Sequence, residues 1–122
     1  MNNLIEESGG KVTGWGMALG TETVTNADLA AKMDTSNEWI LERTGISERR
    51  IGGSTSGLAV RAGQQALEMA GVKATEIDLL ILATTTPDEQ VPATSAIVQD
   101  QLGLTCGAMD LNAACSGFVY SL

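Results

Sequence analysis

Histidine is absent from the 122 residues of this sequence, which removes the commonest general base of enzymes and the commonest metal ligand. We therefore expect no metal site, and a catalytic site must take its base from another residue type. Basic residues are also scarce, since 7 Lys and Arg stand against 15 Asp and Glu and the formal net charge is -8. Such a surface repels a phosphate backbone, so we expect no nucleic-acid partner.

Long apolar segments are absent as well. The longest aliphatic run, Leu79 to Ala83, is far shorter than the roughly 20 residues that span a bilayer. The first residues carry neither a basic patch nor an apolar stretch of signal-peptide length. These absences predict no membrane association and a cytoplasmic location. Only Cys106 and Cys115 could form a disulfide, and a predicted strand between them separates their backbones beyond the bridging limit of about 7 Å, so we expect two free thiols.

The residues that are present favour a folded α/β protein. Hydrophobic residues make up 43% of the sequence and charged residues 18%, with 14 glycines and 3% aromatics. We expect residues 1–10 to form a flexible leader and residues 11–122 to form a partial domain. Periodicity and turn residues predict strands over residues 12–19, 79–83 and 107–112, and helices over residues 26–33, 35–44, 57–70 and 94–102.

The strand over residues 79–83 is continuous and apolar, which predicts burial on both faces, as in a parallel sheet covered by helices. The alternation of strands and helices predicts a layered α/β architecture with a mainly parallel sheet. Three strands make a thin sheet, and a helix that starts near Cys115 has little sequence left in which to continue. We therefore expect an incomplete domain.

The helix boundaries follow from capping residues. Asn26 is predicted to cap the first helix, and Thr35 with Glu38 forms a predicted capping box for the second. Gly45 and Gly71 are predicted helix ends, because glycine readily adopts the left-handed conformation there.

Cys115 lies among small residues, where the last predicted strand ends and a helix is predicted to begin. The backbone N–H groups and the dipole at a helix N-terminus favour a thiolate, which is the nucleophilic form of cysteine. The same N–H groups can help to hold an oxyanion. By spacing alone, however, a free cysteine between alanines is more often a buried small apolar residue.

Three motifs occur in order along the chain: Asp34-Thr-Ser-Asn-Glu-Trp-Ile-Leu-Glu-Arg-Thr-Gly-Ile46, Ala83-Thr-Thr-Thr86 and Asn112-Ala-Ala-Cys-Ser-Gly-Phe118. Together they closely resemble the start of β-ketoacyl-acyl carrier protein synthase III, over residues 11–122. The resemblance implies the thiolase fold, in which two similar α/β halves form five layers and the molecule is usually a homodimer. This chain would supply an incomplete N-terminal half, truncated within the nucleophile helix.

The resemblance implies an initiating condensing enzyme of type II fatty acid synthesis. Cys115 would take an acyl group from acyl-CoA as a thioester and condense it with malonyl-acyl carrier protein, giving 3-oxoacyl-acyl carrier protein, CO2 and CoA. A thiolate suits this role because it is both a soft nucleophile and a good leaving group. No cofactor is implied, since acyl-CoA is a substrate. In the family, a histidine and an asparagine of the second half assist decarboxylation. Asn112 does not match that asparagine, so we expect no condensation by this chain alone.

The resemblance also assigns CoA contacts to the second predicted helix. Trp39 would stack on the adenine, Arg43 would contact the nucleotide, and Thr35 lies near them at the helix start. Trp39 and Arg43 stand four residues apart, which places both side chains on one helix face. Without the resemblance, Trp39 is more often a half-buried packing residue and Arg43 a solvated helix charge.

Val91 aligns with the family position that influences primer length, in a loop that reaches across the dimer toward the partner's acyl pocket. A valine is smaller than the phenylalanine of acetyl-preferring members, which favours a longer or branched primer, and the alternative is an ordinary loop valine. Arg49 and Arg50 form a basic pair for which we expect solvated surface positions rather than carrier-protein docking. Cys106 is assigned no chemistry.

Two alternatives stay open. A second enzymatic interpretation keeps the fold and Cys115 but changes the second substrate, as in chain-terminating or aryl-ketone-forming relatives. The other alternative is a non-catalytic fragment, or a separately encoded half that needs a complementary C-terminal half.

Overall fold

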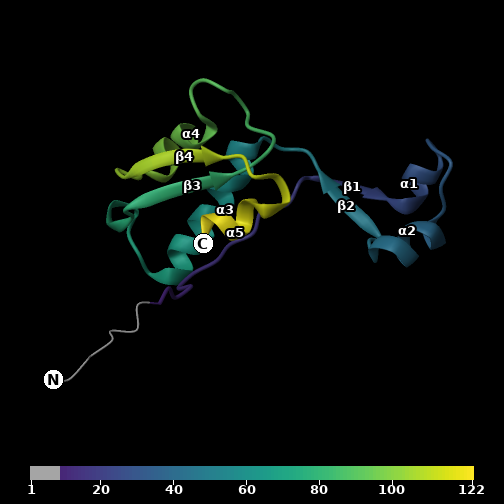
Figure 1. The fold of residues 1–122 in the computed structure, drawn as a ribbon, viewed down its shortest axis with the longest axis horizontal. Coiled ribbons are helices and arrows are strands. Elements are labelled where there is room, and N and C mark those ends of the chain that lie inside the picture. The colour runs from purple at the N-terminus through teal and green to yellow at the C-terminus, as the bar shows by residue number, and fades with distance from the viewer. Residues whose placement is uncertain (1–8) are drawn as a thin grey trace.

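The computed structural model describes residues 9–122, so the leader predicted over residues 1–10 lies almost wholly outside the described residues. The described chain forms two parts that we call the body and the arm (Figure 1). The body contains α3 (Thr55–Ala70), β3 (Leu79–Ala83), α4 (Thr94–Leu102), β4 (Gly107–Leu111) and α5 (Gly117–Ser121). The arm contains β1 (Glu22–Thr25), α1 (Asn26–Ala30), α2 (Asn37–Thr44) and β2 (Glu48–Ile51), and it extends away from the body.

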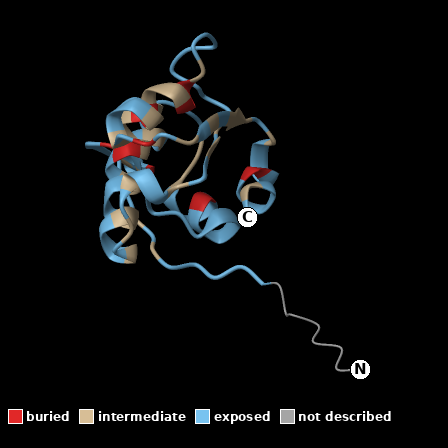
Figure 2. Cartoon of the chain, turned by 90° about the vertical axis from the view of Figure 1, so that its left-hand side faces the viewer, coloured by how far each residue is buried: buried red, intermediate tan, exposed pale blue. Residues whose placement is uncertain are grey.

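The body is built on the parallel pair of β3 and β4, with Leu79 opposite Gly107 and Ala83 opposite Leu111. Parallel neighbours need a crossover connection, and α4 supplies it while contacting both strands and α3. Val98 of α4 is the most buried core side chain, at 1% exposure. Figure 2 shows how few of the described residues reach this degree of burial. No helix among residues 9–122 has the length and apolarity needed to cross a membrane.

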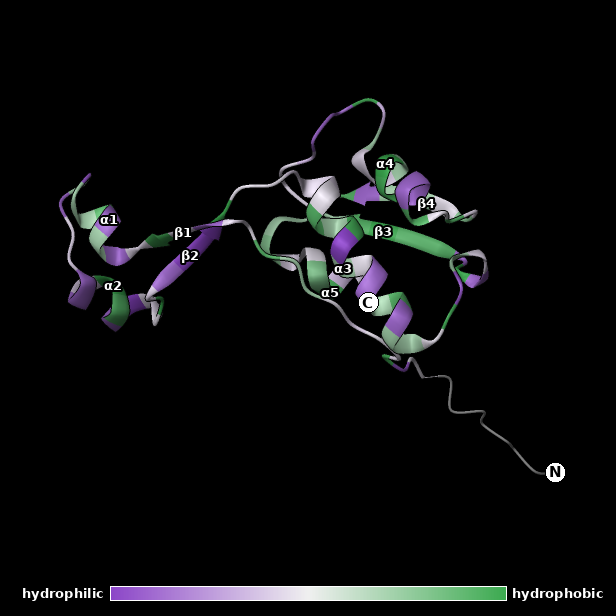
Figure 3. Cartoon of the chain, turned by 180° about the vertical axis from the view of Figure 1, so that it is seen from behind, coloured by the Kyte–Doolittle hydropathy of each residue, from purple (hydrophilic) through white to green (hydrophobic). Residues whose placement is uncertain are grey.

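The strand predicted over residues 79–83 is confirmed with those bounds, and Figure 3 shows it as a continuous hydrophobic arrow. Its predicted burial on both faces is wrong, because every residue of β3 is intermediate or exposed and Leu79 is 49% exposed. The physical reason is that only β4 pairs with β3 in the described chain. A strand is buried on both faces only where further strands and helices flank it.

The predicted helix ends are confirmed at Gly45 and Gly71, which adopt left-handed φ angles of 68° and 65°. The start of α3 is capped by Ser54, whose Oγ accepts a hydrogen bond from the Gly57 N–H at 3.0 Å. The helix predicted over residues 94–102 is confirmed as α4 and ends at Gly103.

Two predicted caps are displaced by one residue. Thr25 rather than Asn26 caps α1, in a capping box with Asp28, and the helix ends at Ala30 instead of residue 33. The hydrogen bond from the Thr25 hydroxyl lowers the pKa of Asp28. Ser36 rather than Thr35 caps α2, and its Oγ accepts from the Trp39 N–H at 3.1 Å. In both cases two hydroxyl or amide residues stand side by side, and backbone geometry selects between them.

The strand predicted over residues 12–19 is wrong, although the close backbone approach predicted for its glycines is confirmed. This segment runs along α3, where Gly16 faces the Ala62 carbonyl so closely that a Cβ has no room. The Met17 N–H donates to Gln65 Oε1 at 3.1 Å. No strand of the described chain pairs with it, so its extended backbone is held by a helix. Trp15 on the outward side is 64% exposed.

The sequence analysis did not predict the strands β1 and β2 or their pairing. These strands are antiparallel, with Glu22 opposite Ile51 and Thr25 opposite Glu48. Figure 3 shows β2 as largely hydrophilic, so it lacks the apolar pattern from which strands are usually recognised.

The side chain of Asn26 is 2% exposed and connects several segments of the arm by hydrogen bonds. Its Nδ2 donates to Asn37 Oδ1 at 3.0 Å and to the Ile46 carbonyl at 2.9 Å, and its Oδ1 accepts from Arg49. The expectation that Arg49 is a solvated surface charge is therefore corrected, because this side chain is half-buried and joins β2 to α1. Arg50 is exposed as expected and donates to Thr23 Oγ1 at 2.7 Å.

Gly16→Ala is expected to lower the free energy of unfolding by about 1–3 kcal/mol, because its Cβ would collide with the Ala62 carbonyl. Urea denaturation followed by circular dichroism measures this loss. Gly10→Ala is the matched control, since its Cβ would meet nothing within 4 Å. Equal stability of the two variants would show that residues 12–19 do not pack on α3.

Candidate active site

Cys115 lies in a short turn between β4 and α5. The turn is the 3-10 helix η2 (Ala114–Ser116), and α5 begins directly after it. Ala114 has a φ of 46°, a conformation that a non-glycine residue adopts rarely and mostly where the surrounding structure enforces it. The structure thus places the thiol between the end of β4 and the start of α5, as the sequence predicts. Cys115 is exposed, unlike the buried apolar cysteine of the alternative interpretation.

The backbone around Cys115 packs tightly against the end of β3. A Cβ on Gly117 would lie 3.2 Å from the Cβ of Ala83, so a larger residue there would press the turn away from the strand. The Ser116 N–H donates to the Ala113 carbonyl at 3.0 Å and closes the turn. Residues 112–118, which we call the nucleophile segment after the role that the sequence predicts for Cys115, are therefore held by this packing and by the turn hydrogen bond.

The nucleophile segment and the loop of residues 84–93 leave the sheet at the same edge. Ala83 and Leu111 end their strands opposite each other, and the Thr84 N–H donates to the Leu111 carbonyl at 3.1 Å. The loop begins after the first of these ends and the nucleophile segment after the second. The carboxyl edge of parallel strands is where ligand sites of α/β proteins usually form.

The 84–93 loop is tied to the start of α3 through Asp88. The Asp88 carboxylate accepts from the Thr55 N–H at 2.7 Å and from the Ser56 N–H at 3.0 Å. Hydrogen bonding from the Ser56 side chain, together with these backbone contacts, holds the pKa of Asp88 below its ordinary value. Val91 projects from the same loop and is 88% exposed.

Asp110 makes a second carboxylate contact of this kind. It accepts from the Thr94 N–H at 3.0 Å and from the Ser95 N–H at 2.7 Å, at the start of α4. The N-cap position of α4 is Ala93, which has no capping side chain, so Asp110 supplies the acceptor from β4. Sequence reasoning missed Asp88 and Asp110 because each lies far along the chain from the helix that it caps. The only local signal was at α4, whose N-cap residue Ala93 has no capping side chain, whereas α3 has its own cap in Ser54.

Trp39 and Arg43 lie together on α2, as their spacing predicts. The Arg43 guanidinium carbon is 4.4 Å from the centroid of the Trp39 ring, a cation–π distance. Trp39 is 53% exposed, so about half of its surface is open to solvent and to a ligand. Arg43 also lies 3.7 Å from a carboxylate oxygen of Glu42, in an exposed pair.

Thr35 borders a hollow of about 340 Å³ that Asp34, Ser36 and Trp39 also line. Its Oγ1 is buried and has no hydrogen-bond partner in the described chain. The structure therefore brings Thr35, Trp39 and Arg43 together at the tip of the arm. It does not bring them to Cys115, which lies between β4 and α5 in the body, whereas α2 lies in the arm (Figure 1).

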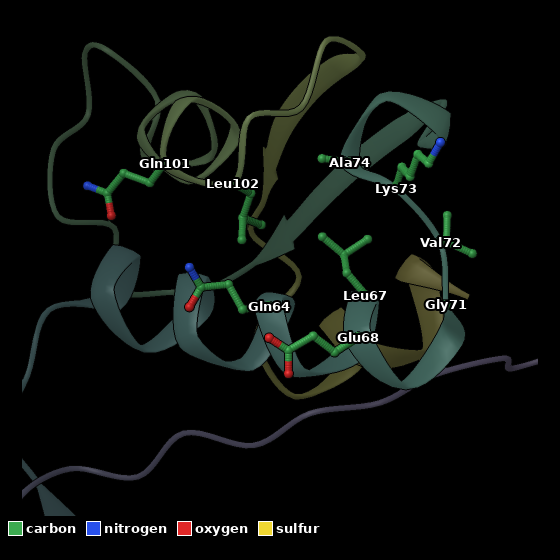
Figure 4. Close-up of a pocket in the computed structure, with 9 residues that line it drawn as sticks. All are labelled: Gln64, Leu67, Glu68, Gly71, Val72, Lys73, Ala74, Gln101 and Leu102. Carbon is green, nitrogen blue, oxygen red and sulfur yellow. The ribbon is translucent and has the colours of Figure 1, made fainter.

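A larger hollow of about 400 Å³ lies between the C-terminal halves of α3 and α4 (Figure 4). The side chains of Leu67 and Leu102 point into it, and Gln64, Glu68 and Gln101 stand around its rim. None of the predicted site residues lines it. In residues 9–122, no cluster of Cys, Asp and Glu side chains is arranged to hold a metal ion.

No family model matches this chain. It is 56% identical over 115 residues to the beta-ketoacyl-[acyl-carrier-protein] synthase III of Bradyrhizobium diazoefficiens, a match that covers 91% of this chain and 35% of that protein. Over 91% of its length, the chain is homologous to β-ketoacyl-acyl carrier protein synthases III, and it spans about 35% of these relatives. The resemblance found in the three motifs is thereby confirmed.

Solved structures of β-ketoacyl-acyl carrier protein synthase III relatives share the fold. That of 3-oxoacyl-[acyl-carrier-protein] synthase III from Aquifex aeolicus superposes with a TM-score of 0.88 at 45% identity, covering 92% of this chain and 37% of that one. The priming β-ketosynthase of a polyketide biosynthetic pathway gives 0.85 at 36% identity, over 91% of this chain and 34% of that one. The predicted thiolase-like fold is confirmed, and the chain spans only about a third of its relatives' length.

Iodoacetamide is expected to alkylate Cys115 several-fold faster than Cys106, because Cys115 is exposed and Cys106 is half-buried. Peptide mass spectrometry over a time course measures the two rates in one sample. Cys115→Ala and Cys106→Ala assign each signal. A faster reaction at Cys106 would contradict the exposed placement of the nucleophile segment.

Proposed function

We propose that this chain is the acylating part of an initiating condensing enzyme of type II fatty acid synthesis. In the proposed reaction, Cys115 takes the acyl group of acyl-CoA, and condensation with malonyl-acyl carrier protein then gives 3-oxoacyl-acyl carrier protein, CO2 and CoA. The observation that carries the proposal is an exposed thiol, at the carboxyl edge of β3 and β4, in a chain related to β-ketoacyl-acyl carrier protein synthase III.

The acylation step needs a thiolate, an acceptor for the developing oxyanion and a leaving group. Cys115 Sγ loses its proton to solvent and attacks the thioester carbonyl, forming an S–C bond. The bond from that carbon to the CoA sulfur breaks, and the CoA thiolate leaves and is protonated. The thiol is open to solvent and to substrate, and the backbone N–H of Cys115 itself is the candidate to hold the oxyanion.

The tip of the arm is the proposed site for the nucleotide part of CoA. An indole that is 53% exposed offers a flat face for an adenine, and the Arg43 guanidinium beside it offers donors to phosphate or base. The unpartnered Thr35 Oγ1 supports this assignment, because a buried hydroxyl without a partner has hydrogen-bonding capacity left for a ligand. The CoA molecule is extended, so its nucleotide and its thioester can occupy the arm and the body separately.

Condensation is proposed to require groups beyond this chain. No histidine is present among the 122 residues, and decarboxylation of a malonyl group needs donors that stabilise the carbanion. Malonyl-acyl carrier protein is the proposed second substrate and a homodimer the proposed assembly. A second candidate keeps Cys115 and changes the second substrate, and the similarity to a tetronic acid condensing enzyme supports it.

Incubation with acetyl-CoA at neutral pH is expected to acylate the wild-type chain and Cys106→Ala, but not Cys115→Ala, because only Cys115 lies in the nucleophile segment. Intact-protein mass spectrometry gives the extent, and peptide mapping locates the thioester. Equal labelling of all three proteins, or none in any with acetyl-CoA and with hexanoyl-CoA in a parallel sample, would reject the proposal in favour of a non-catalytic fragment.

Trp39→Ala is expected to raise the acetyl-CoA concentration for half-maximal acylation by about 5- to 150-fold, since stacking on a base contributes about 1–3 kcal/mol. Initial rates of labelling measure this shift. Trp15→Ala is the matched control, because this indole is 64% exposed and belongs to the segment along α3. Acetyl-pantetheine lacks the nucleotide, so its rate should be the same in both variants. A loss of rate with acetyl-pantetheine would reject the nucleotide assignment.

A further inference from the structure

The arm has almost no apolar core. Among residues 21–51, which the structure describes throughout, the buried side chains are those of Asn26 and Ile40, at 2% and 6% exposure, and one of these two is polar. Hydrophobic stabilisation is roughly proportional to the apolar area removed from water, so one buried isoleucine constrains the packing of α2 only weakly. The orientation of α2 in the arm therefore depends on specific hydrogen bonds.

Asn26 holds α2 at both of its ends. Its Nδ2 donates at 3.0 Å to Oδ1 of Asn37, the first residue of α2, and at 2.9 Å to the carbonyl of Ile46, which follows the C-cap Gly45. The Asn26 N–H also donates to the Ser47 carbonyl at 3.3 Å. Both hydrogens of the side-chain amide are thus used to fix the start and the end of one helix relative to α1.

Arg49 fixes the orientation of this amide. Its guanidinium donates to Asn26 Oδ1. The guanidinium has no acceptor and the Ile46 carbonyl has no donor, so only one of the two amide orientations satisfies both partners. In that orientation the N–H groups of Asn26 point to the ends of α2.

The face that α2 presents to solvent depends on its rotation about the helix axis. Trp39 and Arg43 share the exposed face, whereas Ile40 is buried. Successive helical residues are separated by about 100° around the axis, so a rotation of this size would carry Trp39 into the position of Ile40. Hydrogen bonds at both ends of the helix oppose such a rotation.

We propose that Asn26 is a positioning residue, which sets the nucleotide-binding face of α2 and thereby the preference of the chain for acyl donors that carry the CoA nucleotide. This inference rests on the proposed nucleotide site at Trp39 and Arg43. At 2% exposure Asn26 cannot touch the ligand, so its effect passes through α2.

The first experiment measures binding of adenosine 3′,5′-bisphosphate, which carries the adenine and the 3′-phosphate of CoA but no thioester. Isothermal titration calorimetry gives its Kd for the 122-residue chain. Asn26→Asp is expected to raise this Kd by about 5-fold or more, because a carboxylate still accepts from Arg49 but cannot donate to the Ile46 carbonyl. Thr23→Val is the matched control, since the lost hydroxyl accepts from Arg50 between β1 and β2. An equal Kd in the two variants overturns the proposal.

A double-variant comparison tests whether Asn26 acts through the indole. In the Trp39→Ala background, Asn26→Asp is expected to raise the Kd by less than about 2-fold, because no indole is left to be misplaced. An effect as large as that in the wild-type background would show that Asn26 does not act through Trp39, and the proposal would be rejected.

Amide hydrogen exchange separates positioning from loss of fold. In Asn26→Asp the amides of residues 41–43 are expected to stay protected, because the Ser36 cap and the Gly45 end belong to α2 itself. Asn37→Ala is a second and milder variant, since Asn37 is exposed and alanine favours a helix. It removes the acceptor at the helix start and is expected to raise the Kd by about 2-fold or more. Loss of amide protection in step with loss of affinity in both variants would show a role in folding alone and overturn the proposal.

The last experiment measures the donor preference through acylation of Cys115. Asn26→Asp is expected to raise the acetyl-CoA concentration for half-maximal acylation by the same factor as the Kd of the bisphosphate. Its rate with acetyl-pantetheine, which has no nucleotide, is expected to equal that of wild type. A loss of rate with both donors overturns the proposed preference.

The bisphosphate has no acyl group, so its binding reports on the arm whether or not Cys115 is acylated. Wild type that binds the bisphosphate but is not acylated rejects the proposed acylation, while weaker binding by Asn26→Asp still supports the positioning role. Wild type that does not bind the bisphosphate rejects the nucleotide site, and the role of Asn26 fails with it.

Discussion

The parallel hydrogen bonding between β3 and β4 is the constraint on which the rest of the body depends. Parallel strands need a crossover, which places α4 against the sheet, and their common direction brings both carboxyl ends to one edge. The 84–93 loop and the nucleophile segment start at that edge because Ala83 and Leu111 stand opposite each other. A shift in this register would separate the loop from Cys115, whatever their own conformations.

Two carboxylates fix the positions of the loop and the helix starts near this edge through hydrogen bonds. Asp88 and Asp110 each accept two backbone N–H groups from the first turn of a helix that lies elsewhere in the sequence. Such contacts do at long range what a local N-cap does within one helix, and they also join separate elements. The arm uses an amide in the same way, since the buried Asn26 ties α1, α2 and β2 together.

The body exposes several large apolar side chains to solvent. Trp15, Phe118 and Tyr120 are 64%, 74% and 70% exposed, and they come from the extended segment along α3 and from α5. Within residues 9–122, β3 and β4 form a two-stranded sheet in which each strand has one edge that no other strand covers. Apolar surface of this extent is typical of polypeptide that packs against more protein. It accords with a chain that spans 35% of a curated relative.

What the sequence by itself determined are the features that depend on a few neighbouring residues. Gly45, Gly71 and Gly103 end their helices because the left-handed conformation is a local preference, and the aliphatic run predicted β3 residue by residue. The placement of Cys115 between strand and helix, and of Trp39 beside Arg43, also followed from local order and spacing.

Only the tertiary structure decided the features that need a distant partner. Residues 12–19 carry a strand pattern but find α3 instead of a strand, while the polar β2 becomes a strand because β1 lies beside it. The anchoring roles of Asp88 and Asp110 were invisible in the sequence for the same reason. Hydrogen bonds of backbone and carboxylate groups are formed with whichever partner the fold brings near, and no residue type by itself specifies a partner that lies 15 to 33 positions away.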